Sequence, residues 1–271
     1  MKLSVYTFVK DGIYYDFHLL AMLKHHLPLA DEIVVNEGYS SDGSFEAIKD
    51  LHPKVRVVRN HLDTSEPQAW LRRAKDQARR LCTGDWCILL DCDEFIPEWE
   101  FARLRDHLTR TDKHIIGADY KHFYGNYKVL YERPDRPFPP MRKSIIHRNR
   151  ADIEIYGDGS DVRIPALGAE AEDRQVTFDC HHFGEVRNPA RLRHKWRVQA
   201  KQSIENRWNW LPSFLFDLWP HQWFDDSFVK YLKLYEGPYI EAVRNDPAEF
   251  VRDDFALYRL LTSQKAGARA T

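Results

Sequence analysis

The stretch from Trp86 to Phe95 constrains the fold more than any other part of the chain. An uncharged run, Trp86–Leu90, leads directly into Asp91–Glu94, which holds three carboxylates. A continuous apolar run is typical of a buried parallel strand, and open α/β sheets bind ligands just beyond the carboxyl ends of such strands. The carboxylates therefore fall where a ligand is expected. An acidic turn or the start of a helix would carry the same residue types.

The spacing of Asp91 and Asp93 predicts a metal site. On an extended chain, residues two apart point to the same side. Two hard oxygen ligands at that spacing suit Mg²⁺ or Mn²⁺ that a phosphate already holds in part. The same alternation would turn Glu94 to the opposite face, where we expect a structural role.

Strands and helices alternate ahead of this stretch. This β-α-β-α-β-α-β order predicts a mostly parallel sheet with helices on both faces. Expected strands cover 3–9, 32–36, 55–58, 114–120, 141–147, 152–156 and 175–182, and expected helices cover 14–27, 44–51, 66–81, 189–208 and 227–244.

Composition narrows the class of protein. Lys plus Arg number 40 and Asp plus Glu number 41, for a net charge of −1, which argues against nucleic-acid binding by bulk charge. No run approaches the roughly 20 apolar residues of a membrane span, and Met1–Tyr6 lacks a signal-like apolar region. We therefore expect a cytoplasmic protein with reduced cysteines. The aromatic cluster Trp208–Trp223 leaves open a peripheral contact at the inner face of the membrane, a homodimer contact or simple core packing.

Polar residues follow the second expected strand. Asn36, Glu37 and Asp42 could hydrogen-bond a base and a ribose, although Asp42 would equally suit the cap of the helix that follows. The chain has neither a Gly-x-Gly-x-x-Gly segment after its first strand nor a Gly-Lys-Ser/Thr loop, so a dinucleotide or P-loop site is poorly supported. Arg72 and Lys75, three residues apart and so on one face of a basic helix, could reach a diphosphate or could lie on a solvated face.

Two further segments carry candidate chemistry. His181 and His182 end an expected strand, and several Arg and Lys residues follow, which favours a metal ligand next to an anion-binding helix over a purely structural histidine. Asp158, between two glycines, could serve as a general base that a substrate can approach closely. An ordinary Asp-Gly turn would have the same sequence.

Together these segments resemble the family 2-like glycosyltransferases of the GT-A fold, and among them a bacterial polysaccharide-type subgroup. Ile33–Ser44 resembles the family's strand and Ser-Thr-Asp-Gly segment, with Asn36 where an Asp is usual and one extra loop residue. Gly84–Phe95 resembles its Gly-Asp-aromatic strand and Asp-x-Asp-Glu-Phe motif. Four further segments resemble segments of the subgroup: His122–Tyr127, Arg142–Asn149, Ile155–Asp158 and His182–Pro189, which Lys195 follows.

The resemblance implies an inverting transfer of sugar from a nucleotide-diphosphate sugar to a glycan or lipid-linked acceptor in bacterial surface glycan synthesis. It implies a GT-A-like catalytic domain over 1–205, with a nucleotide-sugar half at about 1–110 and an acceptor half at about 111–205, and a helical extension over 206–271 packed on it.

The resemblance also assigns roles to residues. It implies that Mn²⁺ or Mg²⁺ binds Asp93 and His182, and the alignment makes His182 the ligand rather than His181. It also implies that Asp91 contacts the ribose or the metal. It implies an acidic base, for which we take Asp158 first and Glu172 or Asp173 as alternatives. Contacts to the nucleotide sugar are expected from Phe8, Asn36, Glu37, Asp42, Arg72, Asp91, Arg187 and Lys195.

Two other functions stay open at this point. A sugar nucleotidyltransferase uses a related sheet, but Phe8–Gly12 has fewer glycines than such enzymes carry after their first strand. A non-catalytic carbohydrate-binding or assembly protein would not need Asp91, Asp93 and His182 together.

Overall fold

The computed structural model describes residues 1–61, 69–132, 141–188, 191–192, 194–195 and 231–245. The chain divides into two compact units. The first consists of Met1–Tyr120 and Pro140–His182, and the second consists of Lys121–Pro139 and Phe183–Thr271. Within the described ranges, no helix is long and apolar enough to cross a membrane.

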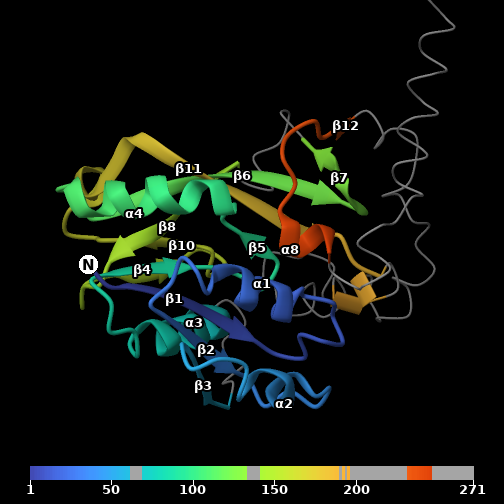
Figure 1. Cartoon of the computed structure of the whole chain (residues 1–271). Coiled ribbons are helices and arrows are strands. Elements are labelled where there is room, and N and C mark those ends of the chain that lie inside the picture. The colour runs from blue at the N-terminus through green and yellow to red at the C-terminus, as the bar shows by residue number, and fades with distance from the viewer. Residues whose placement is uncertain (62–68, 133–140, 189–190, 193, 196–230, 246–271) are drawn as a thin grey trace, which may run out of the picture. The chain divides into compact units, whose positions relative to one another are not determined.

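A four-stranded parallel sheet forms the base of the first unit. Its strands lie in the order β4-β1-β2-β3, which Figure 1 shows from the middle of the picture downward. Strand β1 pairs with both β2 and β4 and is buried at every position, including Ser4 and Thr7. The bounds are β1 Leu3–Val9, β2 Glu32–Glu37, β3 Val55–Arg59 and β4 Trp86–Leu89.

Beyond β4 the sheet becomes mixed. Strand β8 pairs antiparallel with β4 and with β6, and the short β5 pairs antiparallel with β11. Strands β9 and β10 form a separate antiparallel pair. The bounds are β5 Glu94–Phe95, β6 Ile115–Tyr124, β8 Arg142–Arg148, β9 Glu154–Tyr156, β10 Asp161–Arg163 and β11 Glu172–Glu185. The expected α/β architecture, a central sheet flanked by helices, is confirmed.

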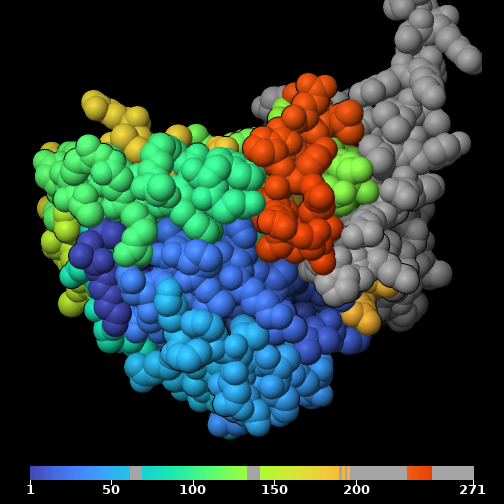
Figure 2. All heavy atoms as spheres, in the orientation of Figure 1, coloured from blue at the N-terminus to red at the C-terminus, as the bar shows by residue number. Residues whose placement is uncertain are grey.

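Helices flank the sheet. The step from β1 to β2 runs opposite to the step from β3 to β4, so right-handed crossovers place α1 and α3 on opposite faces. Helix α4 lies on the surface drawn in Figure 2, and its Leu104 and Leu108, four residues apart, are buried. The bounds are α1 Leu19–His26, α2 Ser44–Ile48, α3 Trp70–Arg79, α4 Phe101–Arg110, and the 3₁₀ turns η1 Glu98–Glu100 and η2 Gly168–Ala171.

Helix α1 begins later than expected. The periodicity predicts a start at Tyr14, but the helix starts at Leu19. Asp16 and His18 have φ angles of 54° and 55°, in the left-handed region. A right-handed helix cannot run through such residues, so Asp11 to His18 form turns at the carboxyl end of β1 instead.

Two buried histidines support the first unit. His147 on β8 has Nδ1 2.9 Å from the Arg148 carbonyl and Nε2 3.0 Å from the Tyr6 hydroxyl. In His26, Nδ1 faces the Met22 carbonyl and Nε2 accepts the Ile96 N–H. Since a carbonyl only accepts, Nδ1 carries the proton in each ring, and the Ile96 N–H shows that Nε2 of His26 is unprotonated, so that ring is neutral. Burial lowers the pKa of both, that of His147 to about 4.

The second unit contains an antiparallel pair, β7 (Asn126–Tyr131) and β12 (Leu232–Leu234), packed through Tyr124, Val129 and Leu232. The helix expected over 227–244 is wrong in its described part, where β12 is followed only by the short α8 (Glu241–Arg244). Pro238 lies between them, and proline disfavours helix at the residue before it.

The other C-terminal helix, expected over 189–208, lies outside the described residues except at 191–192 and 194–195, which are helical. Most of the expected extension over 206–271 also lies outside them.

Candidate active site

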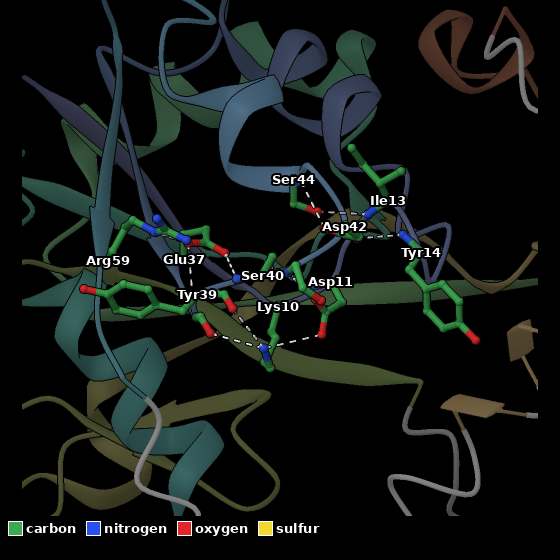
Figure 3. A network of polar contacts seen from close by, with 12 residues as sticks. Lys10, Asp11, Ile13, Tyr14, Glu37, Tyr39, Ser40, Asp42, Ser44 and Arg59 are labelled. Atoms are coloured by element: carbon green, nitrogen blue, oxygen red, sulfur yellow. Dashed lines mark hydrogen bonds and ion pairs between the residues drawn. The ribbon is translucent and has the colours of Figure 1, made fainter.

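The loops that follow β1 and β2 are tied together by internal polar contacts (Figure 3). Lys10 donates to the carbonyls of Gly38 and Tyr39. Asp11 donates its N–H to the Ser40 hydroxyl and accepts the Ser41 N–H on its carboxylate. Each loop therefore fixes the other at the carboxyl edge of the sheet.

Glu37 organises the second of these loops. Its buried carboxylate accepts the N–H groups of Tyr39 and Ser40 and lies 2.6 Å from Arg59 Nε. Desolvation raises the pKa of Glu37, but the bonds from Ser40 and Arg59 outweigh it, so the pKa lies below its usual value. Arg59 also lies between the rings of Tyr39 and Phe45, at 4.3 and 4.1 Å from their centroids. Glu37 is thus ionised and saturated by the protein itself.

Asn36 and Asp42 are likewise engaged within the protein. The Asn36 amide donates to the Ala74 carbonyl and to Gln77, and its oxygen accepts from Asn60. The two carboxylate oxygens of Asp42 accept the Tyr14 N–H and the N–H of Ser44, the first residue of α2. The N-cap residue of α2 is Gly43, so Asp42 supports the start of the helix through the Ser44 N–H without being its cap.

Phe8 is buried at the end of β1, edge-on to Trp70 at 5.8 Å. Contacts of Phe8, Asn36, Glu37 and Asp42 with a nucleotide sugar stay predictions.

The acidic motif forms a tight turn after β4. Asp91 donates its N–H to the Glu94 carboxylate and accepts the Glu94 N–H on its carbonyl. Residues 92 and 93 are in the turn, so the chain is not extended there. The expectations that Asp91 and Asp93 project alike from a strand, and that Glu94 alternates away from them, are therefore wrong.

The turn separates the partners of the two aspartates. Asp93 is almost fully buried, and its Oδ1 lies 3.7 Å from Nε2 of His182. The antiparallel pairing of β11 with β5 brings His182 opposite Glu94. The neighbouring His181 is buried against Trp99. The structure thus brings together the two residues expected to bind the metal most directly, and leaves His181 apart from them.

Asp91 pairs with Lys75, for which the sequence suggested contact with a diphosphate and not with the motif. Lys75, on α3 and 1% exposed, lies 2.5 Å from Asp91 Oδ1 and donates to the carbonyl of Gly159 at 2.9 Å. Its place three residues after Arg72 was visible in the sequence, but not its contact with the motif. One carboxylate of the motif is thus held by a buried cation.

A second lysine, which the sequence reasoning missed, holds Glu94. Lys143, buried on β8, donates to Glu94 Oε1 at 2.9 Å and lies 4.4 Å from the centre of the Tyr120 ring. Burial lowers the pKa of Lys143, but Glu94 and Asp91 outweigh it, so the pKa is raised overall and the lysine stays charged. The only sequence feature that could have indicated this contact was a lysine within an expected strand of mostly buried residues.

Asp158 lies in a turn between Gly157 and Gly159, whose φ angles of 63° and 91° suit glycine. Its carboxylate accepts the N–H and the hydroxyl of Ser160. Desolvation raises the pKa of Asp158, but Ser160 and the charges of Lys75 and Lys143 outweigh it, so the pKa lies below its usual value. Asp158 is therefore ionised at neutral pH and is influenced by the same lysines that hold the acidic motif.

The two alternative bases have other partners. Glu172 accepts from Arg142 at 3.3 Å and from the Ser144 hydroxyl at 3.2 Å. Asp173 lies 3.2 Å from Nε2 of His107 on α4. Asp158 is favoured among the three because its turn shares Lys75 with Asp91 of the acidic motif.

The expected basic residues are distributed over both units. Arg72 donates to the Gly157 carbonyl at 3.4 Å in the first unit. Arg187, which is buried, and Lys195 belong to the second unit. Their contacts with a diphosphate stay predictions.

The pair formed by Asp93 and His182 is suited to hold part of the coordination shell of a divalent ion. Ligand atoms about 2.1 Å from one ion lie within about 4 Å of each other, and the observed 3.7 Å satisfies this limit. In the part of the chain that the structure describes, no group of three or more His, Cys, Asp or Glu side chains is placed to hold a metal alone. Phosphate oxygens and water commonly complete the shell of Mg²⁺ at such sites.

The model of glycosyl transferase family 2 matches residues 19–161. This range is more than half of the 271 residues and includes the acidic motif and Asp158. The chain belongs to this family and is a glycosyltransferase.

Several solved structures are similar to this chain. One is S. aureus TarS 1–349, with 14% identity over 80% of this chain and 68% of that chain, and a TM-score of 0.45. The same protein in complex with UDP-GlcNAc matches with 14% identity, 80% and 70% coverage, and a TM-score of 0.46. Glucosyl-3-phosphoglycerate synthase from Mycobacterium tuberculosis, in complex with Mn²⁺, UDP and glucosyl-3-phosphoglycerate, matches with 15% identity, 74% and 79% coverage, and a TM-score of 0.44. No curated protein sequence matches.

Proposed function

We propose that this glycosyltransferase moves a sugar from a nucleotide-diphosphate sugar to a hydroxyl acceptor with inversion at the anomeric carbon, and that it requires Mn²⁺ or Mg²⁺. The observation that carries the proposal is the turn after β4, where Asp93 lies beside His182 and Asp91 is held by Lys75. This turn lies at the carboxyl end of a central parallel strand, where α/β sheets bind their ligands.

The two aspartates have different roles in this proposal. Asp93 and His182 would hold the ion, since they supply an oxygen and a nitrogen ligand at a compatible separation. When bound, the ion acts as a Lewis acid that offsets the charge developing on the leaving diphosphate. Asp91 contacts the ribose through the carboxylate oxygen that Lys75 does not hold.

Asp158 acts as the general base. It accepts the proton of the acceptor hydroxyl while that oxygen attacks the anomeric carbon, and the bond from the anomeric carbon to the diphosphate oxygen breaks. A single displacement of this kind inverts the anomeric configuration. The lowered pKa of Asp158 keeps the carboxylate ionised and ready to accept a proton at neutral pH.

The acceptor we propose is a glycan or a lipid-linked sugar in bacterial surface glycan synthesis, used in the cytoplasm. The family assignment favours sugar transfer over nucleotidyl transfer and over non-catalytic carbohydrate binding. The pairing of buried lysines with motif carboxylates also favours catalysis, because a protein that only binds sugar has no need to fix them.

A donor screen tests the proposal. Purified protein is incubated with UDP-, GDP-, dTDP- and CDP-sugars, with a mixture of short glycan and lipid-linked acceptors, and with Mn²⁺, Mg²⁺ or a chelator. We expect release of nucleoside diphosphate and a glycosylated product of inverted anomeric configuration with one donor class, and no product with chelator. A retained anomeric configuration, or full activity with chelator, would contradict the mechanism.

A further inference from the structure

Lys75 connects two parts of the first unit that are far apart in the sequence. Its ammonium group contacts the Asp91 carboxylate at 2.5 Å and the Gly159 carbonyl at 2.9 Å. Asp91 belongs to the acidic motif, and Gly159 follows Asp158 directly. One buried cation is therefore shared by the motif and by the turn that carries the proposed base.

The turn that contains Asp158 is docked on α3 at both of its glycines. Arg72 reaches the Gly157 carbonyl, and Lys75 reaches the Gly159 carbonyl. A Cβ atom at Gly159 would lie 3.3 Å from Leu71 and 3.6 Å from Lys75, so the turn lies directly against the helix. The position of Asp158 thus depends on the face of α3 that also holds Asp91.

We propose that Lys75 is a positioning residue that couples donor binding at Asp91 to the placement of Asp158. The inference rests on the proposed function. A nucleotide that orders Asp91 also orders Lys75, and the ordered ammonium holds the Gly159 carbonyl and, with it, the turn. Since Lys75 makes both contacts without a ligand, a nucleotide bound at Asp91 holds the turn, and with it the base, more firmly in place.

A lysine serves this purpose where an apolar residue would not. A buried ammonium must keep its partners, because an unpaired charge in a dry site is very unfavourable. Any movement of Asp91 therefore changes the balance of contacts that Lys75 makes with Gly159. A methionine of similar length would fill the space and hold neither group.

Lys75→Met, Lys75→Arg and the control Lys54→Met test the coupling. Lys54 is a matched control, because its ammonium donates to two carbonyls, those of Leu27 and Ala30, outside the site. Hydrogen exchange of the peptide over 156–160 is measured with and without nucleoside diphosphate and Mn²⁺, together with donor affinity and turnover.

The inference predicts a specific pattern. In the wild type and in Lys54→Met, nucleoside diphosphate slows exchange over 156–160. In Lys75→Met that protection is lost, the donor Kd rises about tenfold and kcat at saturating donor falls about tenfold, as loss of one coupled contact would produce. Adding Asp158→Asn to Lys75→Met lowers kcat by less than it does in the wild type. Lys75→Arg restores part of the protection.

Other outcomes would separate the two proposals. If the wild type binds nucleotide and Lys75→Met keeps ligand-induced protection over 156–160, or if the effects of Lys75→Met and Asp158→Asn on kcat simply add, the coupling is overturned while the proposed function stands. If the wild type binds no nucleoside diphosphate at all, the proposed function fails, and the inference fails with it.

Discussion

The loops after β1 and β2 and the turn after β4 lie at the same edge of the parallel sheet, yet they use polar residues in different ways. In the first region, Glu37 and Asp42 accept N–H groups of the loops, and Asn36 bonds to Ala74 and Gln77 on α3 and to Asn60. In the turn, carboxylates are held by buried lysines that come from α3 and β8. The loops are a rigid frame, whereas the turn keeps concentrated charge next to Asp93 and His182.

This difference indicates that the loops contribute mainly to the stability of the fold and the turn mainly to catalysis. A carboxylate that caps backbone N–H groups stabilises the loop that it shapes. A carboxylate fixed by a cation from a distant element keeps a defined position that a ligand can use, at a cost in desolvation. Substitutions in the frame should therefore lower the melting temperature, and substitutions in the turn should lower turnover.

The largest effect is expected for Asp93→Asn. Loss of the charge next to His182 should lower turnover about a thousandfold, the upper end of what removal of one electrostatic stabiliser costs. The fold should persist, because the amide is isosteric with the carboxylate. Steady-state transfer and a circular-dichroism melt check both parts. Glu98→Gln is the control, since Glu98 forms a similar carboxylate–imidazole pair with His25 at 3.9 Å outside the motif. Near-normal turnover at low metal would show that the metal role is wrong.

A smaller loss of turnover is expected for Asp158→Asn. Removal of a general base should lower kcat about a hundredfold and leave the donor Kd within about twofold, because Asp158 acts on the acceptor. Isothermal titration with the donor and single-turnover kinetics separate the two quantities. Unchanged kcat would move the base to Glu172 or Asp173.

Glu37→Gln should behave in the opposite way. The loss of a charged acceptor for two N–H groups and for Arg59 should lower the free energy of unfolding by about 2–3 kcal/mol. The melting temperature should fall by about 2–4 °C per kcal/mol. Turnover measured well below that temperature should change little. A normal melting temperature with weak donor binding would instead mean that Glu37 contacts the nucleotide, as the sequence pattern suggested.

The smallest expected effect is a pH dependence of the free energy of unfolding, caused by the buried His147. His147 has an ordinary pKa of 6.5 and a folded-state pKa of about 4. The unfolded chain therefore binds more protons between these values, and stability should fall as the pH drops from about 6.5 to about 4. Between pH 7 and pH 5 this amounts to about 2 kcal/mol for His147.

Chemical denaturation at several pH values tests this dependence. His147→Gln should flatten the curve, and His52→Gln, at an exposed position, should not. The same slope in His147→Gln and in the wild type would assign the acid sensitivity elsewhere, with the neutral, buried His26 as the next candidate.

The sequence was sufficient to predict features that depend on residues close together in the chain. The uncharged run at 86–90 predicted β4, the strand expected over 3–9 is present as β1, and the alternation of strands and helices predicted the α/β sheet. The strands expected over 114–120, 141–147 and 175–182 are present as β6, β8 and β11. The motif and the paired histidines marked residues that the structure then brought together at 3.7 Å.

The remaining features depend on contacts between distant elements. A lysine on a basic helix has the same local pattern whether it faces solvent or, as Lys75 does, a carboxylate from another strand. The contact of Lys143 could not be predicted from its local sequence either, because its partner Glu94 lies 49 residues away. The turn at 92–93 and the left-handed residues before α1 override the periodicities that strands and helices would follow. These departures coincide with the edge of the sheet that carries the site.

Metal-dependent nucleotide binding tests the central claim most directly. Calorimetric titration with UDP, GDP, dTDP and CDP, with and without Mn²⁺, is carried out on the wild type, Asp93→Asn, His182→Gln and the control His52→Gln. The account predicts that one nucleoside diphosphate binds the wild type and the control at least about tenfold more tightly with Mn²⁺, which corresponds to about 1.4 kcal/mol. It also predicts that Asp93→Asn and His182→Gln lose this gain. Equal affinity with and without Mn²⁺, or a full gain in both variants, would contradict it.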